Sequence, residues 1–250
     1  MVFFTADDVL SYSIPDTNNP VTIQSDDSIQ RALTVMLSHD FDQLPVVKND
    51  GIAGVITYKS IAKCINSVDE SYVTDSSISM ALVRDVNFVE RDRDVFNLLE
   101  TFAEDDFVLI GNSTELVGIL TRYDILYFMQ YQIEPLLKIG EIEKTLRELF
   151  DSRCEDLDSR ISNTFIDRAE NDDSYEIPES LDRFSFDEYR MFMTKNLEIL
   201  PEQIREDRDI IEPLLEDIRD IRNALFHFRD EADKVDRDKL DIVHNYFTGM

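Results

Sequence analysis

The chain has 250 residues and a formal net charge of −28, from 53 acidic and 25 basic side chains. Hydrophobic residues make up 43% of the sequence, which is enough for a core and argues against global disorder. So large an acidic excess repels phosphate groups, so the composition argues against non-specific nucleic-acid binding and against a DNA partner.

Strand signals are confined to the first half of the chain and begin after a helical lead-in at 6–10. In chain order we expect a strand at 21–23, a helix from Ile29 with N-cap candidates at 25–28, strands at 44–47 and 53–57, and a helix from Ser60. The turn-rich residues 48–51 predict that the last two strands form a hairpin.

The same succession returns after a polar connection at 67–84. In chain order we expect a strand at 86–89, a helix at 94–103, strands at 107–110 and 116–120, and a helix that starts at Asp124 and continues. Gly54–Ile61 and Gly118–Ile125 share a pattern in which Gly precedes three β-type residues that end in Thr. This internal repeat predicts two related units with clefts between them.

After residue 133, the hydrophobic residues recur only with the spacing of helices. We expect helices at 133–150, 154–169, 185–196, 202–229 and 239–247. Ser185 and Glu188 form a capping-box pattern, and Pro213 is expected to kink or split its helix. The predicted fold class is α+β, with a repeat at 1–66 and 67–131 followed by an all-helical domain at 132–250.

The remaining features favour a soluble cytoplasmic protein without a membrane partner. Cys64 and Cys154 provide neither a disulfide framework nor a metal-ligand spacing. The first residues lack the pattern of a signal peptide, and no apolar stretch reaches spanning length. The acidic residues are spread along the chain, and this composition resembles that of haloarchaeal proteins. The alternative, an acidic surface for a basic partner, is less favoured because the excess is global.

The repeat, with Leu44-Pro45-Val46-Val47 and the pattern Gly-x-x-Thr-x-x-Asp, resembles a tandem pair of CBS domains over residues 6–131. The resemblance implies a disc with two related clefts and a pair that dimerises. It also implies an adenosine-containing regulatory ligand such as AMP, ADP, ATP or S-adenosylmethionine, with no required cofactor.

The candidate ligand-binding residues lie where a strand leads into a helix. A carboxylate there can accept hydrogen bonds from both ribose hydroxyls, and a Thr three residues earlier can donate to a phosphate. The second unit has Thr121 and Asp124, with Arg122 as a phosphate partner, whereas the first has Thr57 but Ser60 in place of Asp. We therefore expect one competent cleft, centred on Thr121 and Asp124. The alternative is that Asp124 only caps its helix.

Arg222, Asn223 and His227 match the Arg-(polar)-x(3)-His signature of HEPN domains, helical bundles of prokaryotic RNases and inactive relatives. The segment 184–189 is similar to one that opens an earlier helix in that family. The resemblance implies metal-independent RNA cleavage between two protomers, in which His227 moves protons and Arg222 stabilises phosphate charge. Alternatively, Arg222 pairs with an acid such as Asp220 or Glu216, and His227 packs at an interface.

These patterns together predict a homodimeric regulator in which the CBS pair binds an adenine ligand and modulates a HEPN-like domain. RNA or a protein is the expected partner of that domain. Two alternatives stay open: an endoribonuclease that uses Arg222 and His227, and a non-catalytic scaffold with empty CBS clefts. The sequence leaves open whether the protein is an enzyme, with the non-enzymatic regulator preferred.

Overall fold

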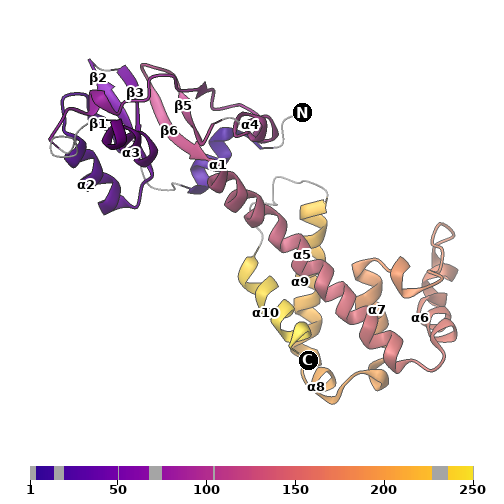
Figure 1. Cartoon of the computed structure of the whole chain (residues 1–250). Coiled ribbons are helices and arrows are strands. Elements are labelled where there is room, and N and C mark those ends of the chain that lie inside the picture. The colour runs from indigo at the N-terminus through magenta and orange to yellow at the C-terminus, as the bar shows by residue number, and fades with distance from the viewer. Residues whose placement is uncertain are drawn as a thin grey trace. The chain divides into compact units, whose positions relative to one another are not determined.

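The computed structural model describes residues 4–13, 20–49, 51–67, 75–103, 105–226 and 236–249 (Figure 1). The chain divides into two compact units, Met1–Gln130 and Tyr131–Met250. His227 lies outside the described residues, as does part of the polar connection expected at 67–84. Among the helices of the described ranges, none has the length and apolar character needed to cross a membrane.

The first unit contains two small sheets of the same topology. One sheet orders β1 (Ile23–Gln24), β2 (Gln43–Lys48) and β3 (Gly51–Thr57), with β1 parallel and β3 antiparallel to β2. The other orders β4 (Phe88–Val89), β5 (Phe107–Gly111) and β6 (Leu116–Thr121) in the same way. The strand pairing repeats as well, because Gln43 faces Thr57 as Phe107 faces Thr121. The predicted repeat pattern is thus present, with first strands only two residues long.

The helices that follow the first strands begin at side-chain caps, and the first of these caps lies among the candidates at 25–28. The Ser28 side chain accepts from Arg31 N–H at the start of α2 (Ile29–His39), and Asp94 accepts from Phe96 N–H before α4 (Val95–Thr101). The helices after each hairpin begin two residues earlier than expected: α3 spans Tyr58–Ser67 and α5 spans Arg122–Arg153.

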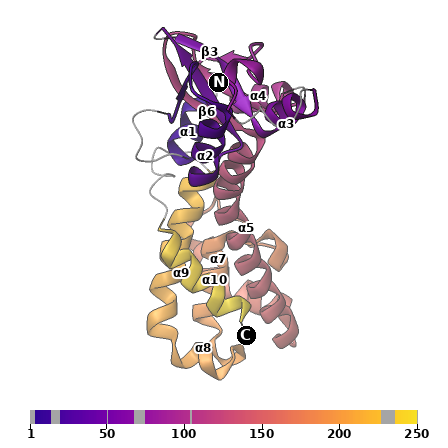
Figure 2. The same cartoon turned by 60° about the vertical axis from the view of Figure 1, so that its left-hand side comes forward.

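The segment before each repeat packs on the core of the other one. Helix α1 (Ala6–Ser13) lies beside β6, and Ala6, Val9 and Leu10 join the core under the second sheet (Figures 1 and 2). Ile78 and Ala81 from the connection between the repeats join the core under the first sheet. The lead-in helix expected at 6–10 therefore belongs to the second sheet by its packing.

The glycines of the repeated pattern make room for these crossing segments. A Cβ atom on Gly54, whose φ is +149°, would lie 2.1 Å from the Val83 carbonyl oxygen. A Cβ atom on Gly118 would lie 2.5 Å from Cδ1 of Leu10 in α1. Gly54 is required because the obstacle is backbone, whereas a Cβ atom on Gly118 would force the Leu10 side chain to move.

The second unit is helical. It contains the later part of α5 together with α6 (Leu157–Asn171), α7 (Phe186–Lys195), α8 (Glu202–Glu206), α9 (Arg208–Phe226) and α10 (Arg237–Thr248). Its core is rich in aromatic side chains, among them Phe150, Phe165, Tyr189 and Phe192. The capping box at Ser185 and Glu188 is confirmed, since both of its reciprocal bonds are present.

The helix is not split at Pro213. The helix predicted at 202–229 is divided at Asp207, and Pro213 lies inside α9. The Asp207 carbonyl accepts from the N–H groups of Ile210 and Ile211, both at 2.9 Å, so α9 starts afresh there. Pro213 is only the sixth residue of α9, where a proline removes one backbone hydrogen bond near the end and the rest of the helix can form.

Candidate functional site: two adjoining clefts at the helix starts

The start of α5 brings Thr121 and Asp124 together. The Thr121 amide donates to Asp124 Oδ2 at 2.7 Å, and the Thr121 hydroxyl donates to the same oxygen at 2.6 Å. The Asp124 amide donates back to Thr121 Oγ1 at 3.4 Å. These reciprocal bonds form a capping box, so Asp124 caps its helix. The other carboxylate oxygen, Oδ1, has no hydrogen-bond partner among the described residues.

The start of α3 has the same arrangement without the charge. Ser60 Oγ accepts from the Thr57 amide at 2.9 Å and donates to the Thr57 carbonyl at 2.9 Å. The Ser60 amide donates to Thr57 Oγ1 at 2.9 Å. A serine therefore satisfies the cap that Asp124 satisfies in the second repeat, but it leaves no carboxylate oxygen for a ligand.

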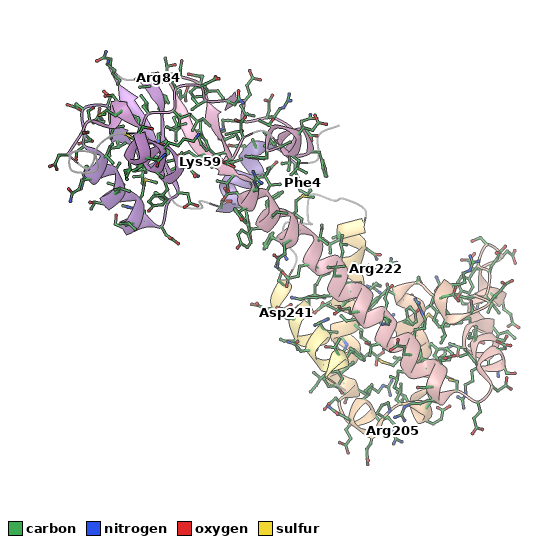
Figure 3. All side chains as sticks on the ribbon, in the orientation of Figure 1. Phe4, Lys59, Arg84, Arg205, Arg222 and Asp241 are labelled. Carbon is green, nitrogen blue, oxygen red and sulfur yellow. The ribbon has the colours of Figure 1, made fainter. Side chains whose placement is uncertain are left out.

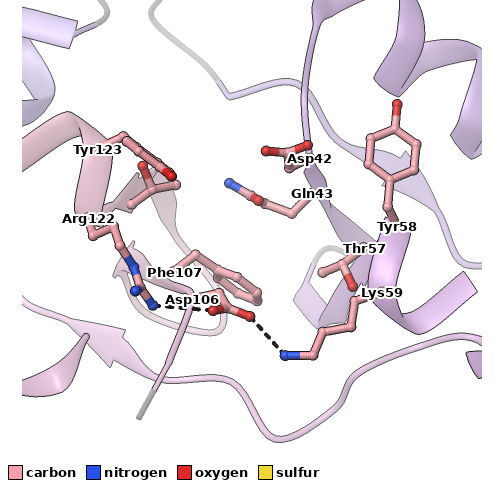
Figure 4. Close-up of a pocket in the computed structure, with 10 residues that line it drawn as sticks. Asp42, Gln43, Thr57, Tyr58, Lys59, Asp106, Phe107, Arg122 and Tyr123 are labelled. Carbon is pink, nitrogen blue, oxygen red and sulfur yellow. Dashed lines mark hydrogen bonds and ion pairs between the residues drawn. The ribbon is translucent and has the colours of Figure 1, made fainter. Parts of the chain in front are cut away.

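A cleft of about 400 Å³, which we call the central cleft, lies between the two repeats (Figure 4). Each repeat contributes five lining residues, and those of the second repeat stand 64 positions after those of the first. The lining residues are Asp42, Gln43, Thr57, Tyr58, Lys59, Asp106, Phe107, Thr121, Arg122 and Tyr123. The central cleft thus lies across the internal pseudo-twofold relationship of the repeats.

Charge breaks the symmetry of the central cleft. The Asp106 carboxylate lies between two cations, with Lys59 Nζ 3.1 Å from Oδ2 and Arg122 Nη2 3.3 Å from Oδ1 (Figure 4). The equivalent acid, Asp42, has no ion-pair partner among the described residues, because Tyr58 and Tyr123 occupy the positions equivalent to Arg122 and Lys59. One side of the cleft is therefore an ion-pair network, while the other presents an unpaired carboxylate and a tyrosine.

A smaller cleft of about 230 Å³, which we call the side cleft, contains the Thr57–Ser60 pair. Its wall also includes Lys63 and the segment from Asp85 to Asn87. The side cleft shares Thr57, Lys59, Asp106 and Phe107 with the central cleft, so the Lys59–Asp106 pair lies between the two.

Asp124 lines neither cleft. The first strands of the two repeats are 66 residues apart, since Ile23 faces Val46 as Val89 faces Ile110. The wall that corresponds to Asp85–Asn87 therefore falls at 19–21, which is partly outside the described residues. Of the predicted ligand-binding residues, Thr57, Thr121 and Arg122 line the central cleft and Ser60 lines the side cleft. Sequence reasoning missed Asp42, Lys59 and Asp106. The 64-residue repeat is the signal that could have found them. It aligns Asp42 with Asp106 and the residues after Thr57 with those after Thr121.

In the helical unit, Arg222 of α9 has a partner that the sequence did not suggest (labelled in Figure 3). Its Nε donates to Glu143 Oε1 of α5 at 3.1 Å, and the two side chains are only 29% and 21% exposed. Asp220 and Glu216, the acids considered as partners, pair with Arg219. Asn223 is half-buried on the same helix.

The comparisons with known proteins agree with the repeat. Residues 6–67 and 77–131 match the family model described as CBS domain. The first half of the chain is therefore a tandem pair of CBS domains. No group of three or more His, Cys, Asp or Glu side chains suited to a metal occurs in the part of the chain that the structure describes.

Two curated relatives match less than half of this chain. A homoserine O-acetyltransferase of Methanocorpusculum labreanum is 29% identical over 109 residues, which cover 42% of this chain and 21% of the relative. An inosine-5'-monophosphate dehydrogenase of Thermoplasma acidophilum is 30% identical over 108 residues, with 42% and 21% covered. The chain thus spans about a fifth of the length of either relative.

The chain also matches solved structures of CBS proteins. One is a CBS domain pair in complex with 5'-methylthioadenosine and S-adenosyl-L-methionine, at 23% identity and a TM-score of 0.43, covering 52% of this chain and 97% of that one. Another is a CBS-domain protein of Agrobacterium tumefaciens, at 21% identity and a TM-score of 0.44, covering 50% and 98%.

Proposed function

We propose that the CBS pair is a regulatory module that binds one adenine-containing ligand through Asp124 and Thr121 and controls the helical unit in a cytoplasmic homodimer. The observation that carries this proposal is the arrangement at the start of α5. Asp124 Oδ2 is held by Thr121, so the carboxylate is oriented, while Oδ1 stays available for ribose hydroxyls. AMP, ADP, ATP, S-adenosylmethionine and 5'-methylthioadenosine are the candidate ligands.

The first repeat contributes less to this function. The Ser60 hydroxyl both accepts a hydrogen bond from Thr57 and donates one to it, and it carries no charge. Arg122, by contrast, extends beside the Thr121–Asp124 pair and is available as a phosphate partner once it leaves Asp106. This difference supports a single adenosine site per chain.

We further propose that the helical unit acts by binding, as a dimerisation or protein-docking domain, and that it does not cleave RNA. The half-buried pairing of Arg222 with Glu143 supports this choice. A catalytic arginine must reach a phosphate, and here a carboxylate of the neighbouring helix already satisfies the guanidinium. An HEPN-type ribonuclease that uses Arg222, Asn223 and His227 remains the alternative.

The decisive experiment compares two aspartates in the same local structure. Asp8 caps α1 as Asp124 caps α5, since the Thr5 amide and hydroxyl both donate to Asp8 Oδ2 at 2.7 Å. Asp8 lines neither cleft. The measurement is thermal unfolding and titration calorimetry of the wild type, Asp124→Ala and Asp8→Ala in high salt with each adenosine ligand.

We expect one ligand to stabilise the wild type and Asp8→Ala and to have no effect on Asp124→Ala. Stabilisation that survives in Asp124→Ala would contradict the assigned site. If no ligand stabilises the wild type, the CBS clefts are empty and the scaffold alternative holds. RNA cleavage by the wild type that His227→Ala abolishes would overturn the non-catalytic role of the helical unit.

A further inference from the structure

The exposed face of α5 in the helical unit has a gap among apolar side chains. Ile133 and Leu137 are 43% and 63% exposed. Gly140 follows them on the exposed side, and a Cβ atom added there would meet no atom within 4 Å beyond its own helix turn, among the described residues. We call this gap the Gly140 notch. Because glycine weakens an exposed helix interior and no described neighbour requires its small size, contacts within the chain do not explain this residue.

The residues beside the notch have the spacing of a helix–helix contact. Ile133, Leu137, Gly140 and Lys144 follow one another at intervals of four, three and four, which places them along one line of α5. Helices that meet along such a line insert large side chains of one helix into gaps of the other. Leu137 is a large side chain and Gly140 a gap, so the same face contains both halves of a self-complementary contact.

We propose that the helical unit binds the same unit of a second copy of this chain through this face, with the two α5 helices antiparallel. Positions 137 and 140 have the same midpoint as positions 133 and 144. One twofold axis therefore puts Leu137 into the partner's Gly140 notch and Ile133 against the partner's Lys144. A parallel pair would stack leucine on leucine and lysine on lysine, and it would leave the notch empty.

Charge on this face also fits a second copy. Lys144 is 71% exposed, and its pair with Glu148 is 3.7 Å long and similarly exposed. So exposed a pair is weak, and Lys144 can turn toward another carboxylate. In the antiparallel pair that carboxylate belongs to the partner's Glu134, which stands next to Ile133 and is 44% exposed. Opposite charges thus meet on both sides of the axis, in a chain whose acidic excess otherwise opposes self-association.

This inference rests on the dimerisation role proposed for the helical unit, and it names the partner and the surface. The test is the dissociation constant of the full-chain dimer, measured by sedimentation equilibrium. In Gly140→Leu the new side chain fills the notch, so we expect the dissociation constant to rise about tenfold. A merely apolar surface would instead associate more tightly with an added leucine. Because leucine favours helix more than glycine does, the variant should unfold at no lower urea concentration than the wild type.

Leu137→Ser and Ile210→Ser form a matched pair of variants. Their side chains are 63% and 64% exposed, and Ile210 lies on α9 of the same unit. We expect Leu137→Ser to raise the dissociation constant about tenfold and Ile210→Ser to leave it unchanged. The proposal is overturned if Gly140→Leu dimerises as tightly as the wild type or more tightly, or if the two serine variants behave alike. In those cases the wild type is still a dimer and the proposed homodimer stands. A wild type that is monomeric at every concentration contradicts the homodimer and this contact together.

Discussion

The Oδ2 atom of Asp124 accepts two hydrogen bonds from Thr121, one from the amide at 2.7 Å and one from the hydroxyl at 2.6 Å. Thr5 and Asp8 make the same two bonds at the start of α1. A carboxylate in this position thus has a structural use wherever a helix begins, and ligand binding is an additional role. The matched pair of caps makes the two roles separable by experiment.

The two caps should contribute similarly to stability without ligand. Asp124→Ala and Asp8→Ala each remove the carboxylate that accepts from a Thr amide and hydroxyl, so each should lower the free energy of unfolding by about 1 kcal/mol. Urea unfolding of the ligand-free variants measures this loss. A much larger loss for Asp124→Ala would mean that Asp124 supports the fold beyond the start of α5.

Restoring the carboxylate in the first repeat should create a second adenosine site. In Ser60→Asp the new carboxylate can accept from the Thr57 amide and hydroxyl and keep one oxygen for a ribose, as Asp124 does. We expect the calorimetric stoichiometry to rise from one to two ligands per chain, while Ser60→Ala stays at one. An unchanged stoichiometry in Ser60→Asp would show that the side cleft lacks more than the acid.

The Glu143–Arg222 pair should matter for stability. Glu143→Gln leaves a mostly buried guanidinium with a weaker partner, so we expect the free energy of unfolding to fall by about 1–3 kcal/mol. Glu148→Gln is the control on the same helix, because its pair with Lys144 is 3.7 Å long and exposed. That substitution should cause no measurable change. Equal effects of both substitutions in urea unfolding would show that the pair has no structural role.

Pro213→Ala should stabilise the helical unit. Pro213 is exposed inside α9, so the substitution removes little packing and restores the hydrogen bond that proline cannot donate. The expected gain in the free energy of unfolding is about 1–3 kcal/mol. Chemical denaturation measures it, and a loss of stability would instead show that the proline ring or its restricted backbone supports the start of α9.

Alkaline pH should weaken the contact between α10 and the break at Asp207. The Tyr246 hydroxyl donates to Asp207 Oδ2 at 2.9 Å, and burial together with this hydrogen bond raises the pKa of Tyr246 to about 12. The folded state thus holds this proton more tightly than the unfolded state, whose tyrosines titrate near pH 10. The contribution is complete below pH 10 and is lost as the pH rises to 12.

Tyr246→Phe isolates this effect. The difference in stability between the wild type and the variant should be constant up to about pH 10 and shrink between pH 10 and 12. The comparison is needed because the pKa values of Tyr175 and Tyr189 are also raised, in both cases mainly by burial. A difference that stays constant up to pH 12 would contradict the raised pKa of Tyr246.

Several features of this protein were determined by the sequence itself because they depend on bonds between near neighbours. The caps at Ser28 and Ser185 satisfy backbone groups three residues away, so the local sequence predicts them. The β-α-β-β-α repeat follows from hydrophobic periodicity in the same way. These signals were sufficient for the CBS pair and for the helical second half.

Other features were decided by packing between distant segments, which no local pattern encodes. Lys59 and Asp106 are 47 residues apart, Glu143 and Arg222 are 79 apart, and α1 crosses to the core of the second sheet. The helix break lies at Asp207 and not at Pro213, and the Tyr246 hydroxyl of α10 donates to the Asp207 carboxylate. Residue chemistry and short-range spacing therefore specified the helices and strands. The burial of their apolar faces then determined which charged side chains come into contact and where the clefts lie.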